Sequence, residues 1–166
     1  MMNDGESASF QHKRTNIIVV LVFMVVQGCD TNYVSPIPPM VVSLNLNLTA
    51  QYPTFRNSSG EYLIFNKPVL AADRIGYGGV LVCSGVLKDD FGNTLYYAYD
   101  LACPHEAEAD IRVAPLTDRL GEVKCAGCGT VYNVGYGFGE PVSGPSKHPL
   151  KRYKTYLQGD YLQVFN

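Results

Sequence analysis

The stretch VVSLNLNL, from Val41 to Leu48, decides the fold class. Its apolar residues alternate with Ser and Asn, and this period of two predicts a β-strand with one buried face. Other short β segments follow it along the chain. They are YLIF (62–65), GGVLVCSGVL (78–87), TLYYAYDLA (94–102), GEVKC (121–125), TVYNV (130–134), KRYKTYLQ (151–158) and YLQVF (161–165).

Two segments between these β stretches have the composition of hairpin turns. They are KDDFGN at 88–93 and QGD at 158–160. No stretch keeps a helical period with caps at both ends, and no internal repeat is present. The sequence therefore predicts an all-β fold, a small antiparallel sandwich or barrel.

Length and composition agree with this class. The 166 residues are enough for one domain, and twelve Tyr, sixteen Gly and ten Pro against 17% charged residues favour a turn-rich β protein. The formal net charge of −2 gives no electrostatic case for binding nucleic acid.

The N-terminal region has the organisation of a secretory signal. His12, Lys13 and Arg14 precede the apolar run 17–26, which is about half of the roughly 20 residues needed to cross a bilayer. The run ends in VQGC, which resembles a bacterial lipobox. This resemblance implies cleavage before Cys29 and lipid attachment to its sulfur. An ordinary secretory signal or a short anchor is the alternative.

Three segments follow from this organisation. We expect a lipoprotein signal peptide over 1–28, a flexible proline-containing tether over 29–40 and a β domain over 41–166. The expected location is the bacterial cell envelope, with the chain attached to a membrane through its lipid.

The cysteines divide into three kinds. Cys29 belongs to the processing site, and Cys83 lies inside an apolar run, where a buried and unreactive thiol is expected. The rest lie in CPH (103–105) and CAGC (125–128). A metal or cluster needs four converging donors, and two short loops that each leave a strand can supply them. The candidate donors are Cys103, His105, Cys125 and Cys128.

At these residues the chain resembles the Rieske iron–sulfur domain, whose two loops carry C-x-H and C-x-x-H around a [2Fe–2S] cluster. The resemblance covers the chain from about Val80 onward. It includes Gly129 after the fourth donor and Gly-Pro at 144–145, which matches the family's proline loop. It implies a Rieske-like β fold with two ligand-bearing loops and a [2Fe–2S] cofactor. It also implies that Thr130 and Tyr132 donate hydrogen bonds to the cluster sulfurs and raise the reduction potential.

The chain departs from this family at one ligand, because Cys128 stands where the family has its second histidine. Three thiolates and one imidazole leave an oxidised [2Fe–2S] core with one negative charge, whereas two of each leave it neutral. The extra negative charge disfavours adding an electron. The expected potential therefore lies between the roughly −150 to +300 mV of Rieske centres and the about −400 mV of all-cysteine plant-type ferredoxins.

Three interpretations of the donors follow. In the preferred one, they hold [2Fe–2S] and the domain carries single electrons. In the second, the same four residues hold Zn²⁺ as a structural site. In the third, no cluster binds, two cysteines pair as a disulfide in an oxidising compartment, and the domain is a binding or structural module.

The resemblance favours an electron carrier over an enzyme, because Rieske oxygenases place substrate chemistry on a second iron in a separate large domain. The expected partner is a redox protein that the sequence does not identify. Glu106, Glu108 and Asp110 are a candidate docking surface for it, with a solvated edge as the simpler interpretation.

Overall fold

The computed structural model describes residues 33–166. The predictions for the signal peptide and for lipidation of Cys29 lie outside the described residues. Ser35–Asn166 form one compact unit. Within the described part of the chain, no helix is long and apolar enough to span a membrane.

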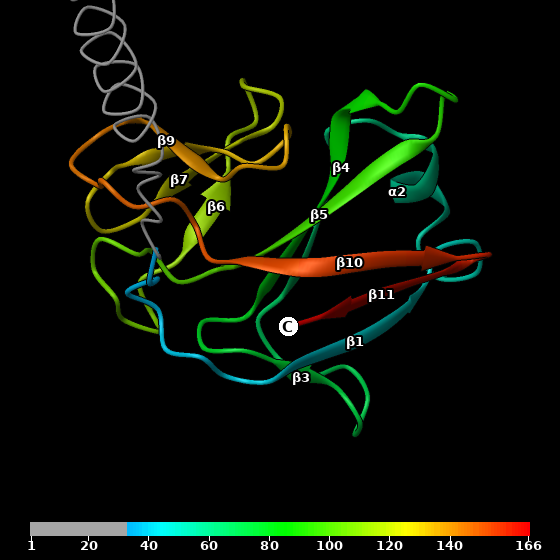
Figure 1. Cartoon of the computed structure of the whole chain (residues 1–166), viewed down its shortest axis with the longest axis horizontal. Coiled ribbons are helices and arrows are strands. Elements are labelled where there is room, and N and C mark those ends of the chain that lie inside the picture. Colours follow the sequence, from blue (N-terminus) through cyan, green and yellow to red (C-terminus); the bar gives the residue numbers. More distant parts are fainter. Residues whose placement is uncertain (1–32) are drawn as a thin grey trace, which may run out of the picture. The chain divides into compact units, whose positions relative to one another are not determined.

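The regular secondary structure of the described chain is almost entirely β (Figure 1). The strands are β1 (Val42–Asn47), β2 (Tyr62–Phe65), β3 (Arg74–Ile75), β4 (Val80–Lys88), β5 (Thr94–Asp100), β6 (Val113–Pro115), β7 (Glu122–Cys125), β8 (Val131–Asn133), β9 (Glu140–Ser143), β10 (Arg152–Gln158) and β11 (Tyr161–Phe165), and the helix is α2 (Pro53–Asn57). Every strand pair is antiparallel. The all-β antiparallel prediction is confirmed.

The strands form two sheets. The larger has the order β2-β4-β5-β10-β11-β1-β3, and the smaller has the order β6-β7-β8-β9. In Figure 1, β10, β11 and β1 run side by side, and the small sheet lies at the left. The two predicted hairpins are present, because β4 pairs with β5 and β10 pairs with β11.

Strand β4 is buried on both of its faces, which explains its unbroken apolar sequence. Val80 and Val82 belong to a core enclosed by the large sheet. Leu81 and Cys83 belong to a second core, between this strand and the small sheet. A strand covered on both sides reads as a continuous hydrophobic run. Cys83 is fully buried there, as the sequence predicts.

The elements that the sequence does not predict are all short: β3, β6, β9 and α2. Pro115 ends β6 and Pro141 lies within β9. Both strands are edges of the small sheet, where proline is tolerated because one side of the strand needs no ladder hydrogen bond.

Part of the segment expected to be a tether is packed on the domain. Ile37 is only 1% exposed. The Lys151 Nζ donates hydrogen bonds to the carbonyl oxygens of Ile37 (3.3 Å) and Pro38 (2.6 Å). Residues from Ser35 onward therefore belong to the compact unit.

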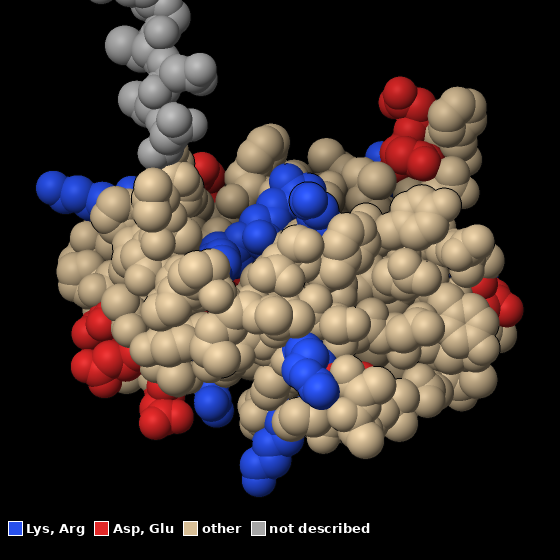
Figure 2. Space-filling view, turned by 60° about the horizontal axis from the view of Figure 1, so that its bottom comes forward, with Lys and Arg blue, Asp and Glu red and all other residues tan. Residues whose placement is uncertain are grey.

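Charged side chains are dispersed on the face shown in Figure 2, with one short run of Lys and Arg and acidic groups mainly at the margins. Two exposed basic residues of β10 rest on the protein's own aromatic rings. The Arg152 guanidinium lies 5.6 Å from the Tyr97 ring centre, and the Lys154 Nζ lies 6.0 Å from that of Phe165. Such contacts between exposed basic side chains and neighbouring rings are typical of a strand face that is exposed to solvent.

Candidate metal centre

The first ligand-bearing loop joins β5 to β6 and folds back on itself. The Cys103 N–H donates to the Ile111 carbonyl at 3.0 Å, and the Ala107 N–H donates to the Cys103 carbonyl at 2.8 Å. The Tyr77 hydroxyl donates to the Ala107 carbonyl at 3.2 Å. Ala107 has a φ of 55°, a left-handed conformation that this tight turn requires. The loop is therefore held on both sides of His105.

A buried carboxylate fixes the base of this loop. Asp100, the last residue of β5, accepts hydrogen bonds from the N–H groups of Tyr77 (3.1 Å), Gly78 (2.9 Å) and Ala102 (2.8 Å). It also accepts one from the Tyr153 hydroxyl at 2.5 Å. Four donors compensate the cost of burying the charge. They come from three separate segments of the chain, and their hydrogen bonds meet at a point just before Cys103 in the sequence.

The second loop joins β7 to β8 and carries the C-x-x-C pair. The Cys125 N–H donates to the Thr130 carbonyl at 2.9 Å, which closes the loop. The Ala126 N–H donates to the Arg112 carbonyl at 3.1 Å, which ties the second loop to the first. Gly129 follows Cys128 with a φ of +73°, a conformation that glycine adopts without strain.

These two loops bring three of the four predicted donors together. The sulfur atoms of Cys103, Cys125 and Cys128 all lie within 4.8 Å of one another, and the first and last are 3.7 Å apart. Cys103 and Cys125 are buried, whereas Cys128 is partly exposed. His105 is exposed and is not a member of this group.

Two hydroxyl groups lie within hydrogen-bonding distance of the sulfurs. The Tyr132 Oη lies 3.2 Å from the Cys103 Sγ, and the Thr130 Oγ1 lies 3.1 Å from the Cys128 Sγ. The same Thr130 oxygen accepts the Ser146 N–H at 3.1 Å, so its own hydrogen is free for the sulfur. These are the two residues to which the sequence resemblance gives this position.

The loop after β9 covers this pair of contacts. A Cβ built on Gly144 would lie 2.5 Å from the Thr130 Cα, and the glycine has a φ of +101°. Only glycine permits this approach without displacement. The close packing places Ser146 on the Thr130 hydroxyl.

The environment differs between the two thiols of the C-x-x-C pair. Burial raises the pKa of the Cys125 thiol to about 12. Burial also raises that of Cys128, but hydrogen bonds from the hydroxyl and N–H of Thr130 outweigh it, so the pKa falls below its ordinary value of 9.0. Cys128 is therefore the readier thiolate, and a bound cation would stabilise Cys125 in the same form.

The donor set fits a thiophilic metal, because three sulfurs converge with no hard oxygen ligand among them. The expected [2Fe–2S] cluster takes two protein ligands on each iron, so three thiolates would be divided between two irons. Here all three lie within 4.8 Å of one another, and the fourth expected donor, His105, is not in the group. The three cysteines fit a metal or iron–sulfur site, and the four-ligand cluster set stays a prediction.

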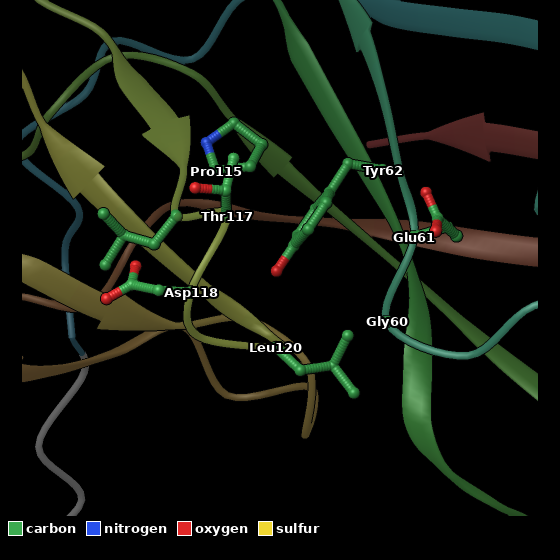
Figure 3. Close-up of a pocket in the computed structure, with 8 residues that line it drawn as sticks. Gly60, Glu61, Tyr62, Pro115, Thr117, Asp118 and Leu120 are labelled. Carbon is green, nitrogen blue, oxygen red and sulfur yellow. The ribbon is translucent and has the colours of Figure 1, made fainter.

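A groove of about 450 Å³ lies elsewhere, between β2 and the loop after β6. Figure 3 shows the Tyr62 ring projecting from β2 toward the loop of Thr117, Asp118 and Leu120. Burial raises the pKa of Tyr62 to about 12, and its hydroxyl donates to the Glu122 carbonyl at 3.4 Å. None of the lining residues is one of the three cysteines, so this groove is separate from the centre.

Three residues of the site were missed by sequence reasoning: Tyr77, Asp100 and Ser146. Each acts through a contact with a residue at least sixteen positions away, so no local pattern marks it. The Gly-Pro turn before Ser146 is the one sequence signal for these residues. It identifies the loop, but it does not predict the hydrogen bond from Ser146 to Thr130.

Fold and site together define an all-β domain with a three-cysteine centre where two loops meet. No protein-family model matches the sequence, and no curated protein matches it. Among solved structures, the chain is similar to one chain of the "Complex of reduced oxygenase and oxidized ferredoxin in carbazole 1,9a-dioxygenase", with a TM-score of 0.45 and 17% identity. The alignment covers 73% of this chain and 99% of that one. The kind of metal or cluster at this centre is therefore inferred from the residues of the centre itself.

Proposed function

We propose that this chain is an electron-transfer protein whose centre is iron bound by the thiolates of Cys103, Cys125 and Cys128. The observation that carries the proposal is the pair of hydroxyls, Tyr132 on one sulfur and Thr130 on another. Hydrogen bonds to ligand sulfurs tune the reduction potential of a metal centre, which is the property that an electron carrier uses.

The residues around the sulfurs have distinct tasks in this function. Bound iron would supply a one-electron couple. Burial of Cys103 and Cys125 keeps water from most of the centre, and a fixed protein environment lowers the rearrangement that accompanies electron transfer. Partly exposed Cys128 is the edge from which an electron reaches a partner. No residue pair near the centre calls for catalysis on a substrate, so we propose a carrier and not an enzyme.

The preferred form from the sequence is a [2Fe–2S] cluster held by Cys103, His105, Cys125 and Cys128. In this form the exposed His105 side chain would turn toward the sulfurs. Acid-labile sulfide distinguishes it directly, because about two sulfides accompany two irons in such a cluster and none accompanies a thiolate-bound ion.

The first test is metal and sulfide analysis of the full chain, produced with iron and sulfide available and purified without air. We expect bound iron, a coloured protein and reversible bleaching by dithionite. The Cys128→Ala variant should lose the iron, and Cys83→Ala, which removes a buried thiol in the same core, should retain it. A colourless protein that contains zinc or no metal contradicts electron transfer.

The second candidate is a cluster-free module that binds or supports a partner and is stabilised by Zn²⁺ or by a disulfide. The observation in its favour is the 3.7 Å between the Cys103 and Cys128 sulfurs, a contact distance from which a disulfide needs only a small shift. Mass mapping of the air-exposed protein separates the two. A quantitative disulfide that persists under reducing purification would favour this candidate.

We further propose that the protein works in the bacterial cell envelope, attached to a membrane by lipid on Cys29, beside an unidentified redox partner. The support is the sequence of the N-terminal region alone. Incorporation of labelled palmitate into the whole chain in cells tests it. Incorporation should be abolished by Cys29→Ser, and equal labelling of that variant would exclude lipidation at this residue.

A further inference from the structure

We propose that the three thiolates hold one tetrahedral metal ion, whose fourth position takes an exchangeable ligand and not His105. This inference rests on the proposed function only in taking Cys103, Cys125 and Cys128 as the ligands. It specifies the number of ions and the coordination of that centre, and it holds whether the native ion is iron or zinc.

The spacing of the sulfurs is that of ligands on one ion. A tetrahedral ion with bonds of about 2.3 Å to sulfur has its ligands about 3.8 Å apart, the edge of the tetrahedron. The sulfurs of Cys103 and Cys128 are 3.7 Å apart, and Cys125 lies within 4.8 Å of both. A single ion reaches all three after small shifts. Two irons with bridging sulfides between them would instead require the thiolates to separate.

Hydrogen-bond donors around the sulfurs compensate the charge of three thiolates on one divalent ion. The Cys125 sulfur accepts backbone N–H groups from Gly127 and Cys128 within the C-x-x-C turn. The Cys128 sulfur accepts the N–H of Thr130 as well as its hydroxyl. Every sulfur therefore has at least one donor beside it, counting the Tyr132 hydroxyl on Cys103.

His105 lies in a turn of fixed backbone and is not a member of this set. The turn from Cys103 to Ala107 is closed by a backbone hydrogen bond, and the Tyr77 hydroxyl fixes its far end. The histidine lies between these two fixed points and is exposed. As the turn stands, its ring is not within the group of converging sulfurs. Water or a small solute is therefore the fourth ligand.

Glu106 belongs to the same turn as His105, and its side chain lies near the second loop. A Cβ built on Gly127 would lie 3.2 Å from the Glu106 Oε1, which places the carboxylate against the C-x-x-C turn. It is not within the sulfur group. The Glu106→Gln variant is therefore a useful companion to the histidine variant, because it tests another potential donor of the same turn.

The experiment is titration of the reduced, metal-free full chain with Co²⁺, followed by optical absorption. We expect one Co²⁺ per chain, intense thiolate-to-metal charge transfer and the visible bands of a tetrahedral ion. Alanine at any of the three cysteines should weaken binding about 100-fold or more, whereas His105→Ala, Glu106→Gln and the control Cys83→Ala should leave it unchanged. Added imidazole should shift the visible bands by replacing the exchangeable ligand.

Three results would overturn the inference. They are a stoichiometry of two ions per chain, a loss of affinity in His105→Ala comparable with that of the cysteine variants, and visible bands that do not respond to imidazole. Cysteine-to-serine variants provide the folding control. If they still unfold cooperatively, their loss of Co²⁺ binding does not come from loss of the folded state. Co²⁺ binding without reversible iron chemistry would refute electron transfer and leave this inference intact, so the two failures are distinct.

Discussion

At the scale of single residues, the chemistry of the centre depends on a relay of hydrogen bonds and not on the cysteines alone. The Ser146 N–H occupies the Thr130 oxygen, and this leaves the threonine hydrogen for the Cys128 sulfur. The Tyr132 hydroxyl is buried against the Cys103 sulfur. Each donor stabilises the more negative, reduced form of a metal–thiolate centre.

Tyr132→Phe should therefore lower the reduction potential of the iron-loaded protein by a few tens of millivolts. A hydrogen bond contributes about 1 kcal/mol, and about 59 mV corresponds to 1.4 kcal/mol for a one-electron couple. Redox titration of the loaded full chain measures the change. The matched control is Tyr99→Phe, which removes a buried hydroxyl of the same core that donates to the Val134 carbonyl and not to sulfur. Equal potentials in the two variants would contradict the role of Tyr132.

The sequence indicated which cysteines converge, because Cys29 falls at the expected processing site and Cys83 in an apolar run, which leaves those of CPH and CAGC. The fourth predicted donor, His105, is not among the converging sulfurs. The C-x-H spacing permits the histidine to be a ligand, and the turn that carries it is fixed in part by Tyr77, which lies far away in the sequence. Contacts of this kind arise from the assembled fold.

At the scale of elements, every long strand was predicted from the sequence, and the strands that were missed, β3, β6 and β9, are short. A strand such as β1 buries every second residue over its whole length, so its pattern is visible. The edge strands β6 and β9 are three and four residues long and contain proline, so they carry no such pattern. The proline-containing segment before β1 was predicted to be a tether, because composition does not show that Ile37 is buried.

Asp100→Asn tests the junction between β5 and the first loop. The asparagine amide group would face donors that now point at a carboxylate, so at least one buried donor would lose its acceptor. We expect the free energy of unfolding to fall by about 2–3 kcal/mol, measured by urea denaturation. Asp90→Asn, in the exposed turn after β4, is the control and should change it little. An unchanged midpoint for Asp100→Asn would show that the junction does not stabilise the domain.

Ile37→Ala tests whether the N-terminal segment is part of the domain. Removing a fully buried isoleucine side chain costs about 2–4 kcal/mol of stability. Val34→Ala, three residues earlier and 81% exposed, should have almost no effect in the same denaturation experiment. If the two variants unfold at the same urea concentration, the contact of Ile37 and Lys151 does not persist in solution.

At the scale of the whole molecule, one pair of strands joins two cores. The alternate residues of β4 and β5 belong to the core inside the large sheet and to the core beneath the small sheet. The second core also contains Cys103 and Cys125, so the centre is continuous with the packing of the domain. We infer that the two sheets unfold as one cooperative unit, because separating them exposes both sides of the same strands.

This shared packing also predicts how stability depends on alkaline pH. Burial raises the pKa of Cys83 from 9.0 to about 12 and that of Tyr62 from 10.0 to about 12, and it raises the pKa values of Tyr99 and Tyr153 as well. The unfolded chain releases these protons first. Stability is therefore full below about pH 9 and declines between pH 9 and pH 12, as the unfolded state ionises and the folded state does not.

Urea denaturation of the full chain at pH 7.5 and pH 10.5 measures this decline. Cys83 alone should account for about 2 kcal/mol of it, because pH 10.5 lies above the unfolded pKa of 9.0 and below the folded pKa of about 12. The control is Cys83→Ala. Its stability is lower at both pH values because the substitution leaves a cavity, but the loss between them should be smaller than in the unchanged protein by that amount. An identical loss in both proteins would mean that the Cys83 thiol ionises in the folded state as easily as in the unfolded one, and that the second core admits water.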